Sequence, residues 1–207
     1  MVQIRQSSGN QPAAPIVVKL GGSLKYKVPD LVPVFRASDR PLLIVPGGGQ
    51  FADAVRLTDV DGNAAHWMAI AAMEQYGWFI ASLNIATTDL LQIPEHTAVY
   101  LPYKSLRTHD PLLHSWDVTS DTIAAWVADV LGLDLLLLKS VDGIVKNGSL
   151  QQQVNEPVVS DVVDPVFIPF VLKRKLQSTI INGLYPERVV KYLKGEPVPG
   201  TRIGTTF

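Results

Sequence analysis

Residues 17–23 (VVKLGGS) and 42–50 (LLIVPGGGQ) decide the fold of this chain, because each is a short apolar run that ends in glycines. A continuous apolar run of this length is typical of a strand buried on both faces of a parallel sheet. Where such a strand passes through glycines into a helix, unpaired backbone N–H groups lie beside the positive end of the helix dipole and suit a phosphate. The two turns therefore predict two anionic groups held close together, with Lys19 offsetting the charge between them.

The rest of the chain alternates apolar runs with amphipathic segments. This alternation predicts an α/β fold with an open, mainly parallel central sheet sandwiched by helices. A proline-containing stretch, residues 102–115, is expected to be a functional loop. The expected helices cover residues 29–35, about 64–83, 120–131 and 186–193. The further expected strands cover residues 97–101, 134–138 and 178–182.

Composition narrows the class of protein. A chain of 207 residues with 47% apolar residues suits one domain with a full core. The net charge of −1 speaks against a nucleic-acid partner, and the absence of cysteine excludes disulfides and thiolate metal sites. Residues 1–14 are expected to form a flexible tail without the apolar core of a signal peptide. Polar residues interrupt the apolar stretch 64–83, so no membrane partner and a cytoplasmic location are expected.

Each candidate motif has an ordinary structural alternative. The first glycine turn could be only a tight connection, but a lysine at the end of a buried strand needs an anion. The second turn contains Gly47-x-Gly49-x-x-Ala52, which matches the dinucleotide fingerprint without its acidic partner and leaves an oxidoreductase as a weaker rival. Thr119 and Asp121 could simply cap a helix, and residues 139–143 could be a turn.

Four segments in register resemble the amino acid kinase family. They are VKLGGS at 18–23, PGGG at 46–49, Ser120-Asp121-x-x-Ala124-Ala125, and Leu138-x-x-Val141-Asp142-Gly143-Ile144. The sequence HWMA at 66–69 and the pattern at 182–188 resemble a narrower branch that contains kinases of methanofuran biosynthesis. The resemblance implies an amino acid kinase-like αβα sandwich over residues 15–207. Its acceptor lobe would span about 15–115 and its nucleotide lobe about 116–207.

The resemblance also implies that the protein uses ATP and Mg²⁺, with no protein ligand to the metal. The implied reaction is transfer of a phosphoryl group to a small phosphate or carboxylate compound. We expect this acceptor to be a furan-type one-carbon coenzyme precursor. Lys19 would bridge the transferring phosphoryl group, and Asp121 would order the catalytic lysines. The implied nucleotide-binding residues are Gly21, Gly22, Ser23, Lys139, Ser140, Asp142 and Gly143. The implied acceptor-binding residues are Gly47, Gly48, Gly49, Asp53, Arg56, His66, Asp117 and Thr119.

The acceptor side carries two further indications. Arg56 follows Gly49 by two helical turns and can face the same ligand, where an arginine suits a phosphate or carboxylate. Isopentenyl phosphate kinases carry a histidine where this chain has Asp53, which disfavours that acceptor. Asp53 or Asp59 is a candidate partner for an amine on the acceptor.

One departure from the family concerns the second catalytic lysine of the C-terminal half, whose usual Gly-Gly-Met context is absent. Residues 173–175 (KRK) are the nearest substitutes, although a solvated basic face is the ordinary interpretation. Because this second lysine is not found, an alternative function remains: a non-catalytic protein of the same fold that senses a nucleotide or oxyanion, or a storage protein. A homodimer or higher homo-oligomer is expected because many large apolar residues share one helix. They are Trp67, Met68, Ile70, Met73, Trp78, Phe79 and Ile80.

Overall fold

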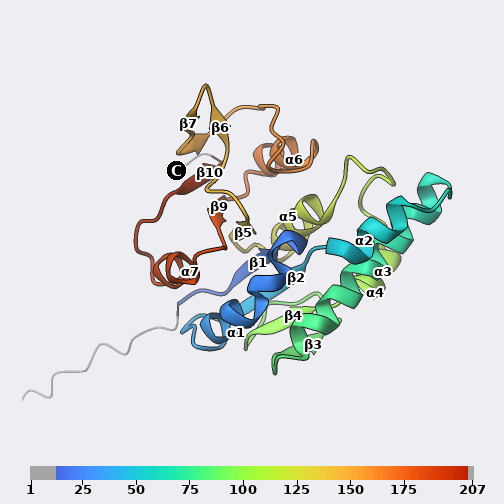
Figure 1. The fold of residues 1–207 in the computed structure, drawn as a ribbon, viewed down its shortest axis with the longest axis horizontal. Helices are drawn as coiled ribbons and strands as arrows, with labels where there is room; N and C mark the ends of the chain where they lie inside the picture. Colours follow the sequence, from blue (N-terminus) through green and yellow to red (C-terminus); the bar gives the residue numbers. More distant parts are fainter. Residues whose placement is uncertain (1–12, 205–207) are drawn as a thin grey trace, which may run out of the picture.

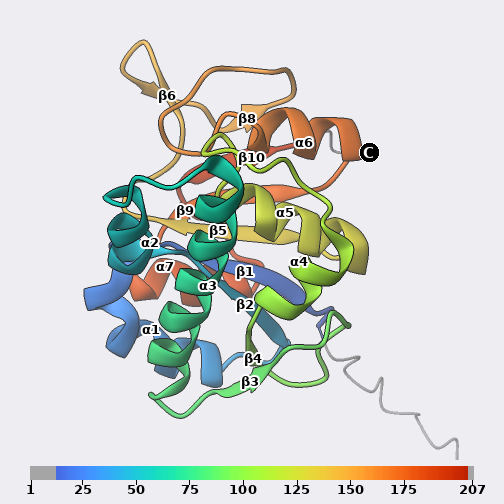
Figure 2. The same ribbon diagram turned by 90° about the vertical axis from the view of Figure 1, so that its right-hand side faces the viewer.

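An eight-stranded sheet runs through the computed structural model, which describes residues 13–204 (Figures 1 and 2). Residues 1–12 of the expected N-terminal tail lie outside the described part. The strand order is β3-β4-β2-β1-β5-β9-β10-β8. In this sheet the pairing of β9 with β10 is antiparallel, so β10 and its parallel neighbour β8 run opposite to the other six strands. The eight strands are β1 (Ile16–Leu20), β2 (Leu42–Pro46), β3 (Ala86–Thr88), β4 (Ala98–Tyr100), β5 (Leu135–Lys139), β8 (Gln153–Val154), β9 (Ser178–Asn182) and β10 (Gly200–Ile203). The predicted α/β class and mainly parallel sheet are confirmed.

The central strands alternate strictly between two buried faces, as the pleat of a strand requires. Val17 belongs to one apolar core and Val18 to the other. Both faces are covered, so β1 and β5 are apolar except at Lys19 and at Lys139, the last residue of β5. Both lysines lie on the side of the sheet that faces α5.

Helices cover both faces of the sheet (Figure 1). One core packs against α1 (Val28–Arg36) and α7 (Pro186–Leu193), and the other packs against α5 (Ser120–Leu131) and α6 (Phe167–Arg174). Three helices follow β2 and β4 in the chain: α2 (Gly49–Arg56), α3 (Gly62–Ala81) and α4 (Tyr103–His109). A 3₁₀ helix, η1 (Gly22–Lys27), and a small hairpin, β6 (Val145–Lys146) with β7 (Ser149–Leu150), complete the fold.

The expectation of a loop over residues 102–115 is wrong in its first half, where α4 forms. Its buried residue Leu106 packs into the core, and the N–H of Tyr103 donates to Glu74 Oε1 of α3 at 2.9 Å. The helix ends at Asp110, which adopts a left-handed conformation with φ of 41°. A carboxylate from a distant helix thus supplies the cap that the local sequence lacks.

The fold places the functional segments at one edge. Because β1, β2 and β5 are parallel neighbours, their carboxyl ends meet, and the two glycine turns and residues 139–143 follow directly. Such an edge is where open α/β sheets bind ligands. The two predicted lobes, which meet at residues 115 and 116, share one sheet, because β1 of the first lobe pairs with β5 of the second. Within residues 13–204 no helix has the length and apolar character needed to cross a membrane.

Candidate active site

The two glycine turns are in contact with each other. A Cβ built on Gly22 would lie 2.1 Å from the Cα of Gly49, so only glycine permits this approach. The N–H of Gly47 donates to the carbonyl of Leu20 at 2.9 Å, and the Tyr76 hydroxyl donates to the carbonyl of Gly21 at 3.3 Å. The predicted juxtaposition of the turns therefore holds in the structure.

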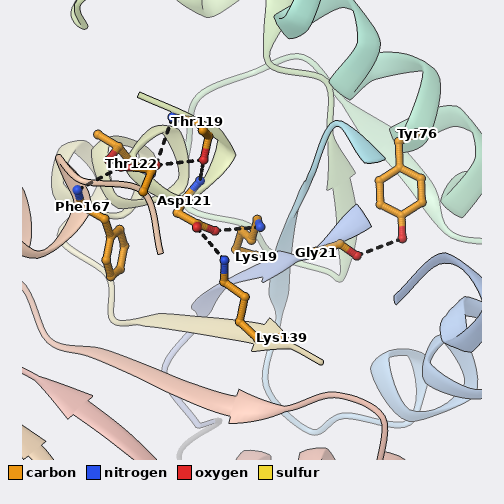
Figure 3. Close-up of polar contacts among 9 residues, drawn as sticks. Lys19, Gly21, Tyr76, Thr119, Asp121, Thr122, Lys139 and Phe167 are labelled. Carbon is orange, nitrogen blue, oxygen red and sulfur yellow. Dashed lines mark hydrogen bonds and ion pairs between the residues drawn. The ribbon is translucent and has the colours of Figure 1, made fainter. Parts of the chain in front are cut away.

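A charged triad lies beside these turns, made of buried Lys19 from β1, buried Asp121 from α5 and partly buried Lys139 from β5 (Figure 3). Lys19 Nζ lies 2.7 Å from Asp121 Oδ1, and Lys139 Nζ lies 2.5 Å from Asp121 Oδ2. Lys19 and Asp121 are only 4% and 3% exposed. The family resemblance implied that Asp121 orders the catalytic lysines, and in the structure Asp121 contacts Lys19 and Lys139.

The triad perturbs the pKa values of its members. Burial alone would raise the pKa of Asp121, but Lys19 and Lys139 outweigh it and hold that pKa below its usual value. Burial and the neighbouring charge of Lys19 lower the pKa of Lys139 to about 8, although Asp121 opposes the shift. Asp121 therefore stays ionised, and Lys139 titrates close to physiological pH.

Lys139 is a candidate for the role of the second catalytic lysine, whose usual Gly-Gly-Met context is absent from the sequence. The sequence assigned it to nucleotide binding, yet its side chain points at Asp121 together with Lys19 (Figure 3). Residues 173–175 lie at the far end of α6, where Arg174 pairs with Asp129 at 2.6 Å. The direction of this side chain could have been predicted from the sequence. Side chains alternate along a strand, so Lys139 lies on the same face of β5 as the buried Leu135 and Leu137.

A cavity of about 580 Å³ opens from this triad. One end is formed by the charged triad and the two glycine turns. The remaining wall combines small and apolar residues of α3, such as Ala69, Ile70 and Met73, with polar residues of α2 and of the start of α5. The predicted residues that line it are Lys19, Gly22, Ser23, Gly48, Gly49, Asp53, Arg56, His66, Thr119, Asp121 and Lys139.

Arg56 and Trp116 close one side of the cavity. The Arg56 guanidinium lies over the Trp116 ring, 3.9 Å from its centroid, which holds the last turn of α2 against the loop before α5. Asp53, one turn earlier in α2, also lines the cavity, whereas Asp59 does not. Sequence reasoning named Arg56 but missed Trp116, because the loop that carries it gave no periodic signal.

His66 lines the same cavity and stacks on His114, with ring centroids 4.0 Å apart and planes 17° from parallel. Burial and the nearby His114 lower the pKa of His66 to about 4, so the ring is neutral at physiological pH. The ring nitrogens of His114 already contact Asn63 Oδ1 and Asp110 Oδ1. Parallel stacked rings cannot aim their lone pairs at one ion, so this group is not arranged as a metal site.

Six predicted residues do not line the cavity. Gly21 and Gly47 are the first glycines of the two turns, and their N–H groups donate to the carbonyls of Leu138 and Leu20. Asp117 is exposed and accepts a hydrogen bond from Ser115. Ser140, Asp142 and Gly143 follow β5. Asp142 Oδ1 accepts from Asn182 and from Arg188, and Gly143 packs against Thr201 with φ of 150°.

Asp164 is a buried residue beside the site that the sequence did not single out. It lies in the loop before α6, yet its carboxylate accepts hydrogen bonds from the first turn of α5, where Asp121 lies. Nothing in the local sequence marks it, since its partners in α5 are more than forty residues away.

A curated relative matches most of the chain. It is the [5-(aminomethyl)furan-3-yl]methyl phosphate kinase of Methanocaldococcus jannaschii, 32% identical over 202 residues, which cover 87% of this chain and 93% of the relative. The chain belongs to the amino acid kinase family. Within that family it is similar to this furan-methyl phosphate kinase, and it is an ATP-dependent small-molecule kinase. No family model matches the chain.

Solved structures share the fold of this family member at low sequence identity. The uridylate kinase of Archaeoglobus fulgidus superposes with a TM-score of 0.69 at 18% identity, covering 91% of this chain and 99% of that one. The UMP kinase of Ureaplasma parvum gives 0.71 at 18%, covering 93% and 99%. An isopentenyl phosphate kinase gives 0.57 at 17%, covering 91% and 100%. Kinase membership replaces the dinucleotide interpretation of the second glycine turn.

Proposed function

We propose that this kinase transfers the γ-phosphoryl group of ATP to the phosphate of a furan-type phosphate monoester, which gives a diphosphate and ADP. The observation that carries the proposal is the triad of Lys19, Asp121 and Lys139 at the contact of two phosphate-type glycine turns. The name of the curated relative supplies the acceptor class.

In the proposed step an oxygen of the acceptor phosphate attacks the γ-phosphorus of ATP. A new P–O bond forms while the bond from the γ-phosphorus to the β–γ bridging oxygen breaks, and ADP departs with that electron pair. Phosphoryl transfer asks the protein mainly for positioning and for stabilisation of charge. The ammonium groups of Lys19 and Lys139 would face the transferring group, and Asp121 holds them in place without touching it.

The nucleotide phosphates would occupy the first glycine turn. The N–H groups of Gly22 and Ser23 begin η1, and Gly22 leaves no room for a side chain. This cradle and the two buried ammonium groups fit a polyphosphate. Mg²⁺ would arrive bound to the ATP oxygens and spread their charge, and no residue of the described chain is assigned as its ligand. Residues 139–143, with Ser140, Asp142 and Gly143, would lie along the rest of the nucleotide.

The acceptor would occupy the outer part of the cavity. Gly48 and Gly49 open α2, whose first N–H groups have no partner within the helix, and Arg56 lies two turns further on. Together they suit the acceptor phosphate. The apolar wall formed by Ile70 and Met73 suits a furan ring, and Asp53 is the carboxylate placed to meet an amine.

The decisive test is product analysis with purified enzyme, ATP, Mg²⁺ and a panel of phosphate monoesters. A furan-methyl phosphate with an aminomethyl group should yield ADP and the corresponding diphosphate by ³¹P NMR. UMP and isopentenyl phosphate should give little product. Nucleotide binding without ADP formation for every acceptor would instead favour a sensor. The sensor alternative was based on the missing second lysine, and it is less well supported because Lys139 supplies a second ammonium group beside Asp121.

We infer that the kinase works as a homo-oligomer in the cytoplasm, where ATP is supplied. The expectation that seven large apolar residues of α3 need a partner is corrected, because Ile70, Met73 and Ile80 are buried within one chain. Trp78 and Met68 remain 57% and 38% exposed on that helix. They provide the apolar face that a second copy would cover.

A further inference from the structure

Asp164, in the loop between β8 and α6, accepts hydrogen bonds from two helices. Its Oδ2 atom accepts from the N–H of Thr119 at 3.0 Å, the hydroxyl of Thr119 at 2.9 Å and the N–H of Thr122 at 3.0 Å. Its Oδ1 atom accepts from the hydroxyl of Thr122 at 2.5 Å and from the N–H of Phe167 at 3.0 Å. Figure 3 shows Thr119, Thr122 and Phe167 gathered beside Asp121.

Four of these donors flank Asp121 in the first turn of α5. The first N–H groups of a helix have no partner within it, and a carboxylate satisfies them and interacts favourably with the helix dipole. The Thr119 hydroxyl, which donates to Asp164, is in turn the cap that faces the N–H of Asp121 at 3.5 Å. The carboxylate of Asp164 thus fixes the turn that aims Asp121 at the lysines.

The charge of Asp164 acts on the same centre. Lys139 is faced by Lys19 from β1, by Asp121 from α5 and by Asp164 from the loop before α6. Lys19 lowers the pKa of Lys139, whereas Asp121 and Asp164 raise it. Asp164 thus adds a second carboxylate near the two ammonium groups, although only Asp121 forms ion pairs with them.

We propose that Asp164 is a positioning residue for phosphoryl transfer: it fixes the first turn of α5 so that Asp121 reaches both lysines, and its carboxylate adds a negative charge beside the triad. The inference deepens the proposed function and rests on it for its effect on turnover. A neutral cap would not serve equally, because all five partners of Asp164 are donors. An asparagine there would set its own N–H₂ group against one of them.

Three variants separate charge from geometry. Asp164→Asn removes the charge and one acceptor oxygen. Thr122→Val removes one hydrogen bond to Asp164 and leaves the charge in place. Asp129→Asn is the matched control, because it breaks the ion pair with Arg174 in the last turns of the same helix, away from the cavity.

The first measurement does not depend on activity. Trace labelling of lysine amines across a pH series, read by mass spectrometry, gives the midpoint at which Lys139 becomes reactive. We expect the midpoint to fall by roughly half a unit to one unit in Asp164→Asn, as loss of a nearby opposite charge requires. It should stay at the wild-type value in Thr122→Val and in Asp129→Asn.

The second measurement is steady-state kinetics. In Asp164→Asn we expect kcat to fall on the order of tenfold or more, with the acceptor KM changed much less, since the triad acts in the transition state. Thr122→Val should lower kcat severalfold, and Asp129→Asn should leave it unchanged.

The outcomes separate the two claims. Wild-type enzyme that forms no diphosphate would contradict the proposed function, while the labelling midpoints would still report on Asp164. A folded Asp164→Asn protein with wild-type midpoint and kcat but a lower melting temperature would overturn the inference, because it would show a role in stability alone. Should Asp164→Asn fail to fold, wild-type kcat in Thr122→Val would overturn it.

Discussion

Lys19 is a charged side chain on a strand whose other four residues are buried and apolar. Burying an ammonium group is costly unless an opposite charge is present, and Asp121 provides only one carboxylate for two lysines. The excess positive charge is what a transferring phosphoryl group would neutralise. The burial of Lys19 is therefore better explained by binding of a polyanion than by a purely structural ion pair.

Replacement of Lys19 by alanine tests this role. We expect Lys19→Ala to lower kcat on the order of 10²-fold or more, as loss of a charge-stabilising donor does. Steady-state ADP release measures the effect. Lys104→Ala is the control, since Lys104 is an exposed lysine on α4 that pairs with Asp89. Near-normal turnover in Lys19→Ala would remove the mechanism.

The pKa of Lys139 makes a pH prediction. Its value of about 8 means that the cationic fraction falls as the pH rises through 8, and an uncharged amine no longer attracts ATP phosphates. We therefore expect kcat/KM for ATP to decline on the alkaline side with a midpoint near 8. Arginine stays charged across this range, so Lys139→Arg should flatten the alkaline limb even if its overall rate is lower. An alkaline limb that is identical in both proteins would assign the titration to another group.

At the scale of elements, the close contact of η1 with α2 brings together the two glycine turns that are proposed to bind phosphate groups. Gly22→Ala would place a Cβ against Gly49, so the two turns must separate. We expect kcat/KM to fall by about 10²-fold with a modest loss of stability, because displacement of reacting groups by an ångström has costs of this size. Enzyme assays combined with thermal unfolding measure both.

Gly132→Ala is the contrasting control for that variant. Gly132 ends α5 with φ of 64°, and a Cβ added to it would meet no atom within 4 Å, so alanine adds backbone strain without a clash. It should lower the melting temperature and leave the rate unchanged. Equal losses of activity in the two variants would show that the turn contact has no special role.

The elements also show what the sequence could and could not predict. The strands β1 and β2 and their glycine turns were predictable because apolar runs and glycine are local signals. The helix α4 was missed because Glu74, a residue of α3, caps its start. Asp164 was missed for a related reason, since four of its five donors come from a segment brought near only by folding. Local patterns find the elements, whereas long-range caps appear only in the fold.

At the scale of the whole molecule, α2 and α3 pack together at the side of the sheet (Figure 2). Met68 and Trp78 of α3 are exposed there. Met68, Gln75 and Trp78 follow one another at helical spacing, and a groove beside Met68 and Gln75 runs along α2. Tryptophan and methionine are enriched at protein interfaces, so Trp78, which is 57% exposed, and Met68 support the proposed homo-oligomer.

A homo-oligomer built on this face should dissociate when Trp78 is replaced by a charged residue. We expect light scattering of the wild-type protein to give at least twice the mass of one chain, and Trp78→Lys to shift it toward the monomer, because a buried unpaired charge at an interface costs several kcal/mol. Val159→Lys is the control, since Val159 is fully exposed in the loop before α6, away from this face. A wild-type protein that stays monomeric at every concentration, or dissociation by Val159→Lys alone, would place no interface on α3. Because α3 also lines the cavity through His66 and Ile70, dissociation should raise the acceptor KM more than it lowers kcat.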